Sequence, residues 1–136
     1  MIEKFDIKVS DVDIDLLNQK IALTRWPDEI NNKWSHGTDL NFLKDLTKQW
    51  TNEFNWREHE KKINDIGSYR FQTSSGLKIH YLHAKSNKGN AIALVMTHGW
   101  PGSIQEFIKI IPILQKNCPI PLDIICPALP GFGFSD

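Results

Sequence analysis

A short stretch of the chain, His98-Gly99-Trp100-Pro101-Gly102-Ser103, combines residue types that allow a backbone to bind an anion. It follows an apolar run and precedes a helical pattern, so the chain must turn sharply at the glycines and the proline. Glycine permits positive φ, and the first turn of a helix presents N–H groups that lack an intrahelical acceptor. We therefore expect the amides of this loop to stabilise a negative charge, with His98, Gly99, Trp100 and Pro101 as candidate site residues.

Other side chains of reactive types have structural explanations. Ser103 stands where a helix begins, which is the position of an N-cap. Ser135 lies in a glycine-rich loop without a base beside it in the sequence. His80 and His83 are three residues apart on an expected strand, so they point to opposite faces and do not form a metal pair. For His98 we expect hydrogen bonds to neighbouring backbone rather than proton transfer, and we expect no metal site.

The first half of the chain predicts helices. Ser10 precedes apolar residues at helical spacing, and Trp26-Pro27 is expected to end this helix. A polar linker that includes Asn31 follows, and Thr38 is the expected N-cap of a second helix. One apolar face of the second helix is formed by Leu43, Leu46, Trp50 and Phe54. A third, short helix is expected from about Trp56 to Ile63.

The second half predicts strands. Alternating apolar residues on either side of Ser75-Gly76 indicate a β-hairpin. These residues are Tyr69, Phe71, Thr73, Leu77, Ile79 and Tyr81. The run Ala91–Thr97 is apolar almost throughout, which predicts a strand buried on both faces of a mainly parallel sheet. A helix containing Phe107 to Leu114 and a second buried strand, Leu122 to Cys126, complete a strand–helix–strand unit with an expected right-handed crossover.

These patterns predict an α/β fold in two parts. The pattern changes once, near Ile66-Gly67, from helical spacing to alternation. Residues 1–66 are therefore expected to form a helical arm, and residues 67–136 a core that contains the sheet.

The composition argues against several classes of function. The chain has 16 basic and 16 acidic residues, and this zero formal net charge argues against a nucleic-acid partner. Cys118 and Cys126 are too few for a disulfide framework, so reduced side chains are expected. The longest apolar run, Ala91–Met96, is far shorter than the ~20 residues of a membrane helix, and there is no signal-peptide pattern. We expect no membrane segment and a cytoplasmic location.

Three separate motifs resemble the epoxide hydrolase family, in particular its microsomal and juvenile-hormone branch. The loop His98–Ser103, followed by Glu106-Phe107, resembles the H-G-x-P turn of these enzymes. The segment Pro127–Asp136 is similar to the P-x-L-P-G-[FY]-G-F-S stretch after the next strand of the family. Further residues resemble the helical arm ahead of the hydrolase core: Leu23-Thr24-Arg25-Trp26-Pro27, Trp34, Gly37, Trp50, Phe54-Asn55-Trp56-Arg57 and Ile79-His80. The resemblance covers nearly the whole chain and implies the N-terminal part of an α/β-hydrolase fold.

The resemblance also implies a reaction, the hydrolysis of a small apolar epoxide to a vicinal diol without a metal or cofactor. In the family an aspartate opens the epoxide and forms an ester, two lid tyrosines bind the epoxide oxygen, and a histidine activates the water that cleaves the ester. The loop supplies half of the oxyanion hole. By this mapping the N–H of Trp100 is a donor, Pro101 fixes the turn through a cis peptide bond, and His98 and Gly99 shape the loop.

The tryptophans are expected to divide between the two parts of the chain. The side chain of Trp100 is a candidate for the wall of the substrate pocket. The other four are expected to pack the arm against the core, and they are Trp26, Trp34, Trp50 and Trp56.

The sequence contains no G-x-[Ser/Asp]-x-G nucleophile elbow. In the family the nucleophile, the lid tyrosines, the second acid and the histidine all follow the segment that here ends at Asp136. The resemblance therefore implies that this chain is an N-terminal portion, holds no catalytic residue and is inactive alone. Two alternatives stay open: part of another α/β-hydrolase such as a haloalkane dehalogenase, which shares the H-G-x-P turn, or a truncated non-catalytic chain that binds or regulates a partner.

Overall fold

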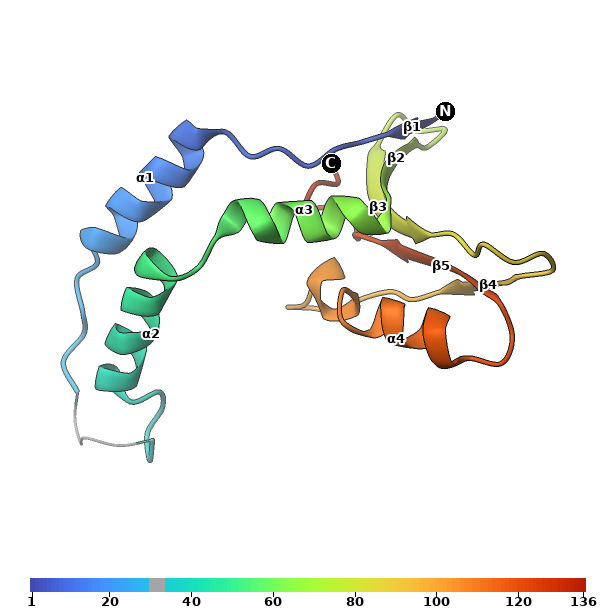
Figure 1. Cartoon of the computed structure of the whole chain (residues 1–136). Coiled ribbons are helices and arrows are strands. Elements are labelled where there is room, and N and C mark those ends of the chain that lie inside the picture. The colour runs from blue at the N-terminus through green and yellow to red at the C-terminus, as the bar shows by residue number, and fades with distance from the viewer. Residues whose placement is uncertain (30–33) are drawn as a thin grey trace. The chain divides into compact units, whose positions relative to one another are not determined.

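The computed structural model describes residues 1–29 and 34–136, which form one five-stranded sheet and several helices (Figure 1). In chain order the elements are β1 (Ile2–Lys4), α1 (Asp11–Ala22), α2 (Leu40–Asn52), α3 (Trp56–Ile66), β2 (Ser68–Gln72), β3 (Lys78–Ala84), β4 (Ile92–Val95), the 3₁₀ helix η1 (Ile104–Phe107), α4 (Ile110–Asn117) and β5 (Leu122–Pro127). The strand order is β1-β2-β3-β5-β4, and among the described strands only β4 and β5 pair in parallel. The predicted α/β class is confirmed, but the sheet is mixed rather than mainly parallel.

Two compact units divide the described chain. One unit combines Met1–Ile7 with Arg57–Asp136 and holds the sheet, and the other, Lys8–Trp56, holds α1 and α2. The predicted division between residues 66 and 67 placed β1 and α3 in the arm, whereas these two units place them with the sheet. As a statement about domains, that division stays a prediction. No helix in the described ranges is long and apolar enough to cross a membrane.

Strand β1 corrects the expectation that the first half of the chain is helical. Its residues pair antiparallel with β2, with Ile2 opposite Phe71. The side-chain amide of Asn64 in α3 then accepts from the N–H of Ile7 at 2.9 Å and donates to the carbonyl of Ile7 at 2.8 Å. Three residues are too few to show a period in the sequence, so only the pairing with β2 reveals this strand.

The core of the sheet-containing unit is formed by the sheet, by helices α3 and α4 and by the segment after β1. Its fully buried apolar side chains come from the segment after β1, from α3, β3, α4 and β5, and they are Ile7, Ile63, Leu82, Ile111, Ile124 and Cys126. Cys118 and Cys126 are free cysteines, as expected. Burial raises the pKa of the Cys126 thiol to about 11, so this side chain acts as a small apolar group.

Strands β2 and β3 form the predicted hairpin. They pair antiparallel, with Tyr69 opposite Tyr81, and their rings stack with centroids 5.7 Å apart. Gly76 closes the turn at a φ of +93°, and its N–H donates to the carbonyl of Thr73 at 3.1 Å. The turn residues in the sequence therefore predicted the hairpin correctly.

The buried face of β3 is the opposite of the one that its apolar alternation suggests. His80, Leu82 and Ala84 are buried, whereas Leu77, just before the strand, is exposed. A period of two determines which residues share a face, but the packing of the sheet decides which face meets the core.

Strand β4 is an edge strand rather than a strand buried on both faces. In the described chain it has a neighbour on one side only, and Ile92 and Val95 are 54% and 59% exposed. The strand–helix–strand unit that it begins is confirmed by the parallel pairing of β4 with β5. The expected single helix is divided into η1 and α4.

Helix α1 begins after Ser10, as predicted, but ends early. The N–H of Asp13 donates to Oγ of Ser10 at 3.1 Å. The helix ends at Ala22, and Leu23 is its C-cap, so the predicted stop at Trp26-Pro27 is wrong. A proline disfavours helical backbone only at the residue before it, and α1 ends before that residue is reached.

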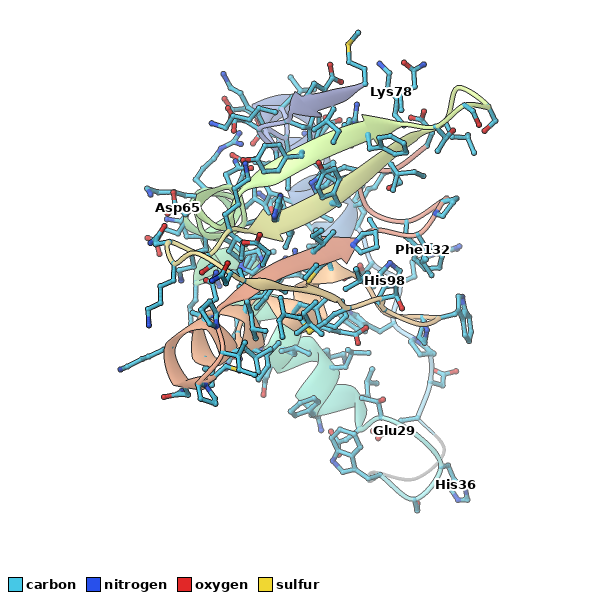
Figure 2. The ribbon with its side chains drawn as sticks, turned by 90° about the vertical axis from the view of Figure 1, so that its right-hand side faces the viewer. Glu29, His36, Asp65, Lys78, His98 and Phe132 are labelled. Atoms are coloured by element: carbon cyan, nitrogen blue, oxygen red, sulfur yellow. The ribbon has the colours of Figure 1, made fainter. Side chains whose placement is uncertain are left out.

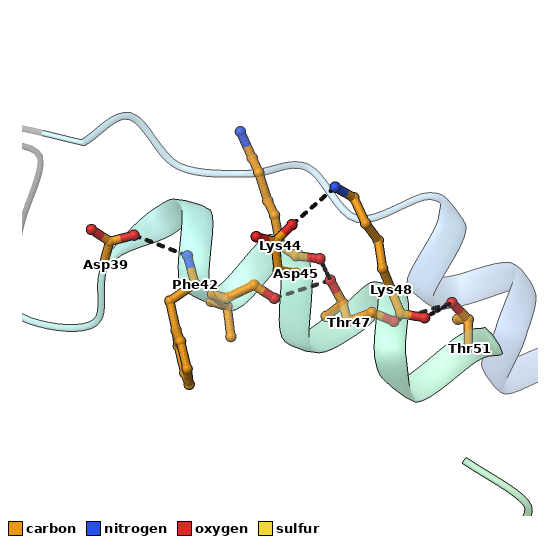
Figure 3. Close-up of polar contacts among 8 residues, drawn as sticks. Asp39, Phe42, Lys44, Asp45, Thr47, Lys48 and Thr51 are labelled. Atoms are coloured by element: carbon orange, nitrogen blue, oxygen red, sulfur yellow. Dashed lines mark hydrogen bonds and ion pairs between the residues drawn. The ribbon is translucent and has the colours of Figure 1, made fainter. Parts of the chain in front are cut away.

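Helix α2 is capped by Asp39 and not by the predicted Thr38. The carboxylate of Asp39 accepts from the N–H of Phe42 at 2.9 Å (Figure 3). Both residue types are good caps, but only aspartate adds a negative charge at the positive end of the helix dipole.

The predicted apolar face of α2 is largely exposed in this chain. Leu46 and Trp50 are exposed, and Phe54 lies beyond the end of the helix. Trp34 is also exposed, although its ring contacts Phe42 with centroids 5.0 Å apart. The expectation that Trp34 and Trp50 are packed away from solvent is therefore wrong for this chain. The predicted linker residue Asn31 lies outside the described residues.

Gly67→Ala is expected to destabilise the protein more than Gly76→Ala does. Both glycines have positive φ, +108° and +93°, but a Cβ on Gly67 would lie 2.7 Å from the backbone oxygen of His83, whereas a Cβ on Gly76 meets nothing within 4 Å. We expect Gly76→Ala to lower the free energy of unfolding by about 1–2 kcal/mol from φ alone, and Gly67→Ala by about 1–3 kcal/mol more. Urea denaturation measures both losses, and equal losses would contradict this explanation.

Candidate functional site

Two loops meet where β4 and β5 end. The loop His98–Ser103 follows β4, and the segment Ala128–Asp136, which we call the glycine loop, follows β5. The strands are parallel, so their carboxyl ends lie at the same edge of the sheet, which is where ligands of α/β proteins bind. The fold thus brings together two motifs that are about thirty residues apart in the sequence.

His98 joins these two loops. Its ring is buried, with Nδ1 3.1 Å from the carbonyl oxygen of Gly99 and Nε2 3.1 Å from the backbone N of Leu129. The amide of Leu129 can only donate, so Nε2 is the acceptor and Nδ1 carries the proton that is donated to Gly99. The ring also contacts Phe132 edge-on, with centroids 5.0 Å apart (Figure 2). Both ring nitrogens are thereby occupied by backbone, which suits a structural role.

The turn after His98 is tight and leaves backbone amides without an acceptor among the described residues. The N–H of Gly102 donates to the carbonyl of Gly99 at 2.7 Å, and the peptide bond between Trp100 and Pro101 is cis, as the resemblance implied. The N–H of Trp100 has no acceptor among the described residues. The Trp100 side chain is 85% exposed, so in this chain it does not line an enclosed pocket.

Ser103 is the helix cap that the sequence predicts. Its Oγ accepts from the N–H of Gln105 at 3.2 Å, and the carboxylate of Glu106 accepts from the N–H of Ser103 at 3.1 Å. This capping box orients the first amides of η1 beside the loop. A methyl group on Gly102 would collide with the carboxylate of Glu106 and would have to displace it from the capping box.

The glycine loop is bonded along strand β3. The N–H of Ala128 donates to the carbonyl of His80 at 2.9 Å, and the backbone N–H of Lys78 donates to the carboxylate of Asp136 at 2.7 Å. Ser135 Oγ accepts from the N–H of His80 at 2.9 Å and donates to the carbonyl of Ala128 at 2.8 Å. Ser135 is therefore a structural bridge, and its Oγ bonds to backbone groups rather than to a histidine ring or a carboxylate that would activate it.

Sequence reasoning missed the importance of His80. Its side chain is completely buried, Nε2 lies 2.8 Å from Oγ of Ser68, and Nδ1 has no partner among the described residues. The rings of Phe5 and Phe134 each meet it edge-on at 5.5 Å. Burial, with a smaller contribution from the charge of Arg70, lowers the pKa of His80 to about 4. The sequence placed this histidine on an expected strand and among the residues of the family resemblance, but neither observation distinguishes a buried position from an exposed one.

His83, on the same strand as His80, does not belong to a metal site in the described chain. Burial lowers the pKa of His83, and the described residues contain no group of three or more potential metal ligands.

A hollow between α1 and α2 is lined partly by Thr47, Lys48 and Thr51. Both threonine hydroxyls donate to carbonyls of their own helix, and Lys48 pairs with Asp45 at 3.0 Å (Figure 3). These polar groups are thus already occupied within the helix.

Comparisons with known proteins agree on one family. Residues 2–107 match the family described as epoxide hydrolase N terminus. A putative epoxide hydrolase of Stigmatella aurantiaca (strain DW4/3-1) is 40% identical and is aligned with 99% of this chain and 32% of its own length. Epoxide hydrolase 1 of Sus scrofa is 35% identical, again over 99% of this chain and 32% of the relative. The chain therefore spans about a third of the length of these curated relatives.

Two solved structures extend this similarity to the fold. The epoxide hydrolase of Aspergillus niger matches 100% of this chain and 37% of its own with a TM-score of 0.86 at 26% identity. The juvenile hormone epoxide hydrolase of the silkworm Bombyx mori matches 100% of this chain and 38% of its own, with a TM-score of 0.86 at 30% identity. The described elements thus correspond to the N-terminal part of an α/β-hydrolase fold.

Removing the His98 ring is expected to destabilise the protein. His98→Ala leaves the partly buried N–H of Leu129 without its acceptor, which costs about 1 kcal/mol, the low end of the range for buried donors. The matched control is His36→Ala, because His36 is exposed and such changes stay within about 0.5 kcal/mol. Urea denaturation of both variants measures the difference, and a loss no larger than that of the control would show that the bond between the loops is unimportant.

The stability of the protein is expected to fall as the pH falls from 6.5 to about 4. In this window His80 is protonated in the unfolded chain, whose pKa is 6.5, but not in the native state, whose pKa is about 4. The unfolded state then binds more protons, so the free energy of unfolding decreases toward low pH by as much as about 3 kcal/mol. In His80→Gln this slope should flatten, with a residual slope from His83, and an unchanged slope would show that His80 is not its source.

Proposed function

The chain belongs to the epoxide hydrolase family, and we propose that it forms the N-terminal part of an enzyme that adds water to a small apolar epoxide to give a vicinal diol. The single observation that carries the proposal is the loop His98–Ser103. It lies at the carboxyl end of a strand and has a backbone amide without an acceptor. The relatives named above are epoxide hydrolases, which favours this reaction over the haloalkane dehalogenase alternative.

In this proposal the loop provides one half of an oxyanion hole. The N–H of Trp100 donates to the oxyanion that forms when water attacks an ester intermediate, and its freedom from internal acceptors supports this role. Pro101 and Gly99 hold the turn, and His98 holds the loop against the glycine loop. None of these side chains exchanges a proton with substrate, because both nitrogens of His98 are engaged by backbone groups.

The remaining chemistry requires groups that this sequence does not contain. The ester arises when a carboxylate opens the epoxide ring, and a histidine must then activate the hydrolytic water. The 136 residues contain no nucleophile elbow, so we propose that residues 1–136 alone form no diol. The reaction as proposed needs no metal or cofactor.

The exposed edge of β4 suggests where further chain would pack. Parallel strands are normally covered on both faces and paired on both sides, but Ile92 and Val95 are exposed and β4 has one neighbour. We propose that further strands of the enzyme continue the sheet beside β4. Strands in this position would lie beside the loop His98–Ser103, which follows the carboxyl end of β4.

The proposal predicts diol formation that depends on the N–H of Trp100. The transcript is first read beyond the codon for Asp136, where a G-x-D-x-G elbow is expected, and the encoded protein is assayed for diol with an alkyl epoxide. Trp100→Pro removes the N–H and should lower kcat by about 10²–10³, which is the usual effect of losing an oxyanion-hole donor. Trp100→Ala keeps the N–H and is the matched control.

Two outcomes would contradict different parts of the proposal. No diol from the natural protein with any of a series of apolar epoxides would contradict the reaction. Equal losses of kcat in Trp100→Pro and Trp100→Ala would contradict the role of the amide, provided that circular dichroism shows both variants to be folded.

A further inference from the structure

Arg70 on strand β2 makes two contacts that link separate parts of the chain. Its Nη2 donates to the carbonyl oxygen of Phe134 in the glycine loop at 2.8 Å. Its Cζ lies 3.8 Å from the centre of the Phe5 ring, directly over the ring face. Nε is buried without a hydrogen-bond partner among the described residues. The guanidinium is thus held between an aromatic ring and a backbone carbonyl.

Phe5 completes this arrangement from the segment that follows β1. Its N–H donates to the carbonyl of Ser68 at 3.0 Å, which holds the segment beside β2. Its ring lies 6.0 Å from the ring of Phe134 and 5.5 Å from that of His80. Arg70 and Phe5 therefore contact the glycine loop at the same residue, one through the backbone and the other through the side chain.

The glycine loop is bonded internally, so a restraint at Phe134 extends to Leu129. The N–H of Phe132 donates to the carbonyl of Leu129 at 3.0 Å, and the N–H of Ser135 donates to the carbonyl of Phe132 at 3.1 Å. The N–H of Gly131 donates to the carbonyl of Asp136 at 2.9 Å. Consecutive turns of this kind limit the loop to small concerted movements. The N–H of Leu129 is in turn bonded to His98, at the start of the other loop.

We propose that Arg70 and Phe5 are positioning residues, which hold the glycine loop and, through the bond between Leu129 and His98, hold the loop His98–Ser103 in place. A charge-assisted hydrogen bond is stronger and more directional than a neutral one, and a cation over an aromatic ring adds an attraction that fixes the guanidinium plane. The consequence for catalysis, a correctly aimed N–H of Trp100, rests on the function proposed above. The restraint on the two loops does not depend on that function.

Hydrogen exchange in the natural protein that contains this chain tests the restraint. Arg70→Met keeps the length of the side chain but removes the donor and the charge. Amide exchange in peptides that cover residues 98–103 and 128–136 should become about tenfold faster, while peptides from β4 and β5 keep their rates. Arg70→Lys, which keeps a cation and a donor, should restore part of the protection. Phe5→Leu, which removes the aromatic face, should give an intermediate increase in both loops.

Lys85→Met is the matched control. Lys85 also lies over a ring of the hairpin, with Nζ 5.8 Å from the centre of Tyr69, but it makes no hydrogen bond to the glycine loop among the described residues. Its removal should leave exchange in both loops unchanged. If Arg70→Met raises exchange in all peptides alike, or only in residues 128–136 and not in 98–103, the proposed positioning is wrong. If Arg70→Met does not fold, the same comparison is made with Arg70→Lys and Phe5→Leu.

Kinetics separate this inference from the proposed function. If the natural protein forms diol, Arg70→Met should lower kcat with little change in KM, and Arg70→Lys should recover part of the loss. A change in KM with kcat unchanged would overturn the positioning of the amide. If no epoxide is hydrolysed, the proposed function fails, but the exchange measurement still decides whether Arg70 holds the two loops.

Discussion

The parallel pairing of β4 with β5 is the constraint on which the rest of the site depends. Because parallel strands end at the same edge of a sheet, the loop that follows each strand emerges beside the other. The hydrogen bond from Leu129 to Nε2 of His98 then joins the two loops and sets the position of the ring proton. A histidine with both nitrogens bonded to backbone is held in one orientation, and the N–H of Trp100 in the same loop has no acceptor among the described residues.

The β2–β3 hairpin supports this edge through polar groups that are costly to bury. The N–H of His80 donates to Ser135 in the glycine loop, Arg70 adds a charged donor to Phe134, and Ser68 bonds to the ring of His80 within the hairpin. Each bond recovers part of the hydration free energy that burial removes. Nδ1 of His80 has no partner among the described residues, and burial, with a smaller contribution from the charge of Arg70, lowers the pKa of this histidine to about 4. The same burial makes the loops sensitive to a substitution in the hairpin.

Two of the exposed apolar surfaces in the described chain lie on elements with a regular apolar pattern. One is the free edge of β4, and the other is the face of α2 that includes Leu46 and Trp50. Apolar side chains at a helical or strand period normally meet another layer of structure, since burial of apolar area is the main driving force of folding. The chain spans about a third of its curated relatives, so both surfaces are consistent with the proposal that further chain of the enzyme covers them.

Local patterns in the sequence were sufficient for the helices, for the hairpin at Ser75-Gly76, for the strand–helix–strand unit and for the His98–Ser103 loop, because capping, turn geometry and hydrophobic period act between near neighbours. The same patterns could not reveal β1, which depends on a partner more than sixty residues away, nor the buried face of β3. The sequence offered two adjacent residues that can cap α2, Thr38 and Asp39. Only the structure shows that Asp39 is the cap. The contacts of His98 with Leu129 and of Arg70 with Phe134 join residues 31 and 64 positions apart. Only the tertiary structure decides such contacts, since they depend on which strands become neighbours in the sheet.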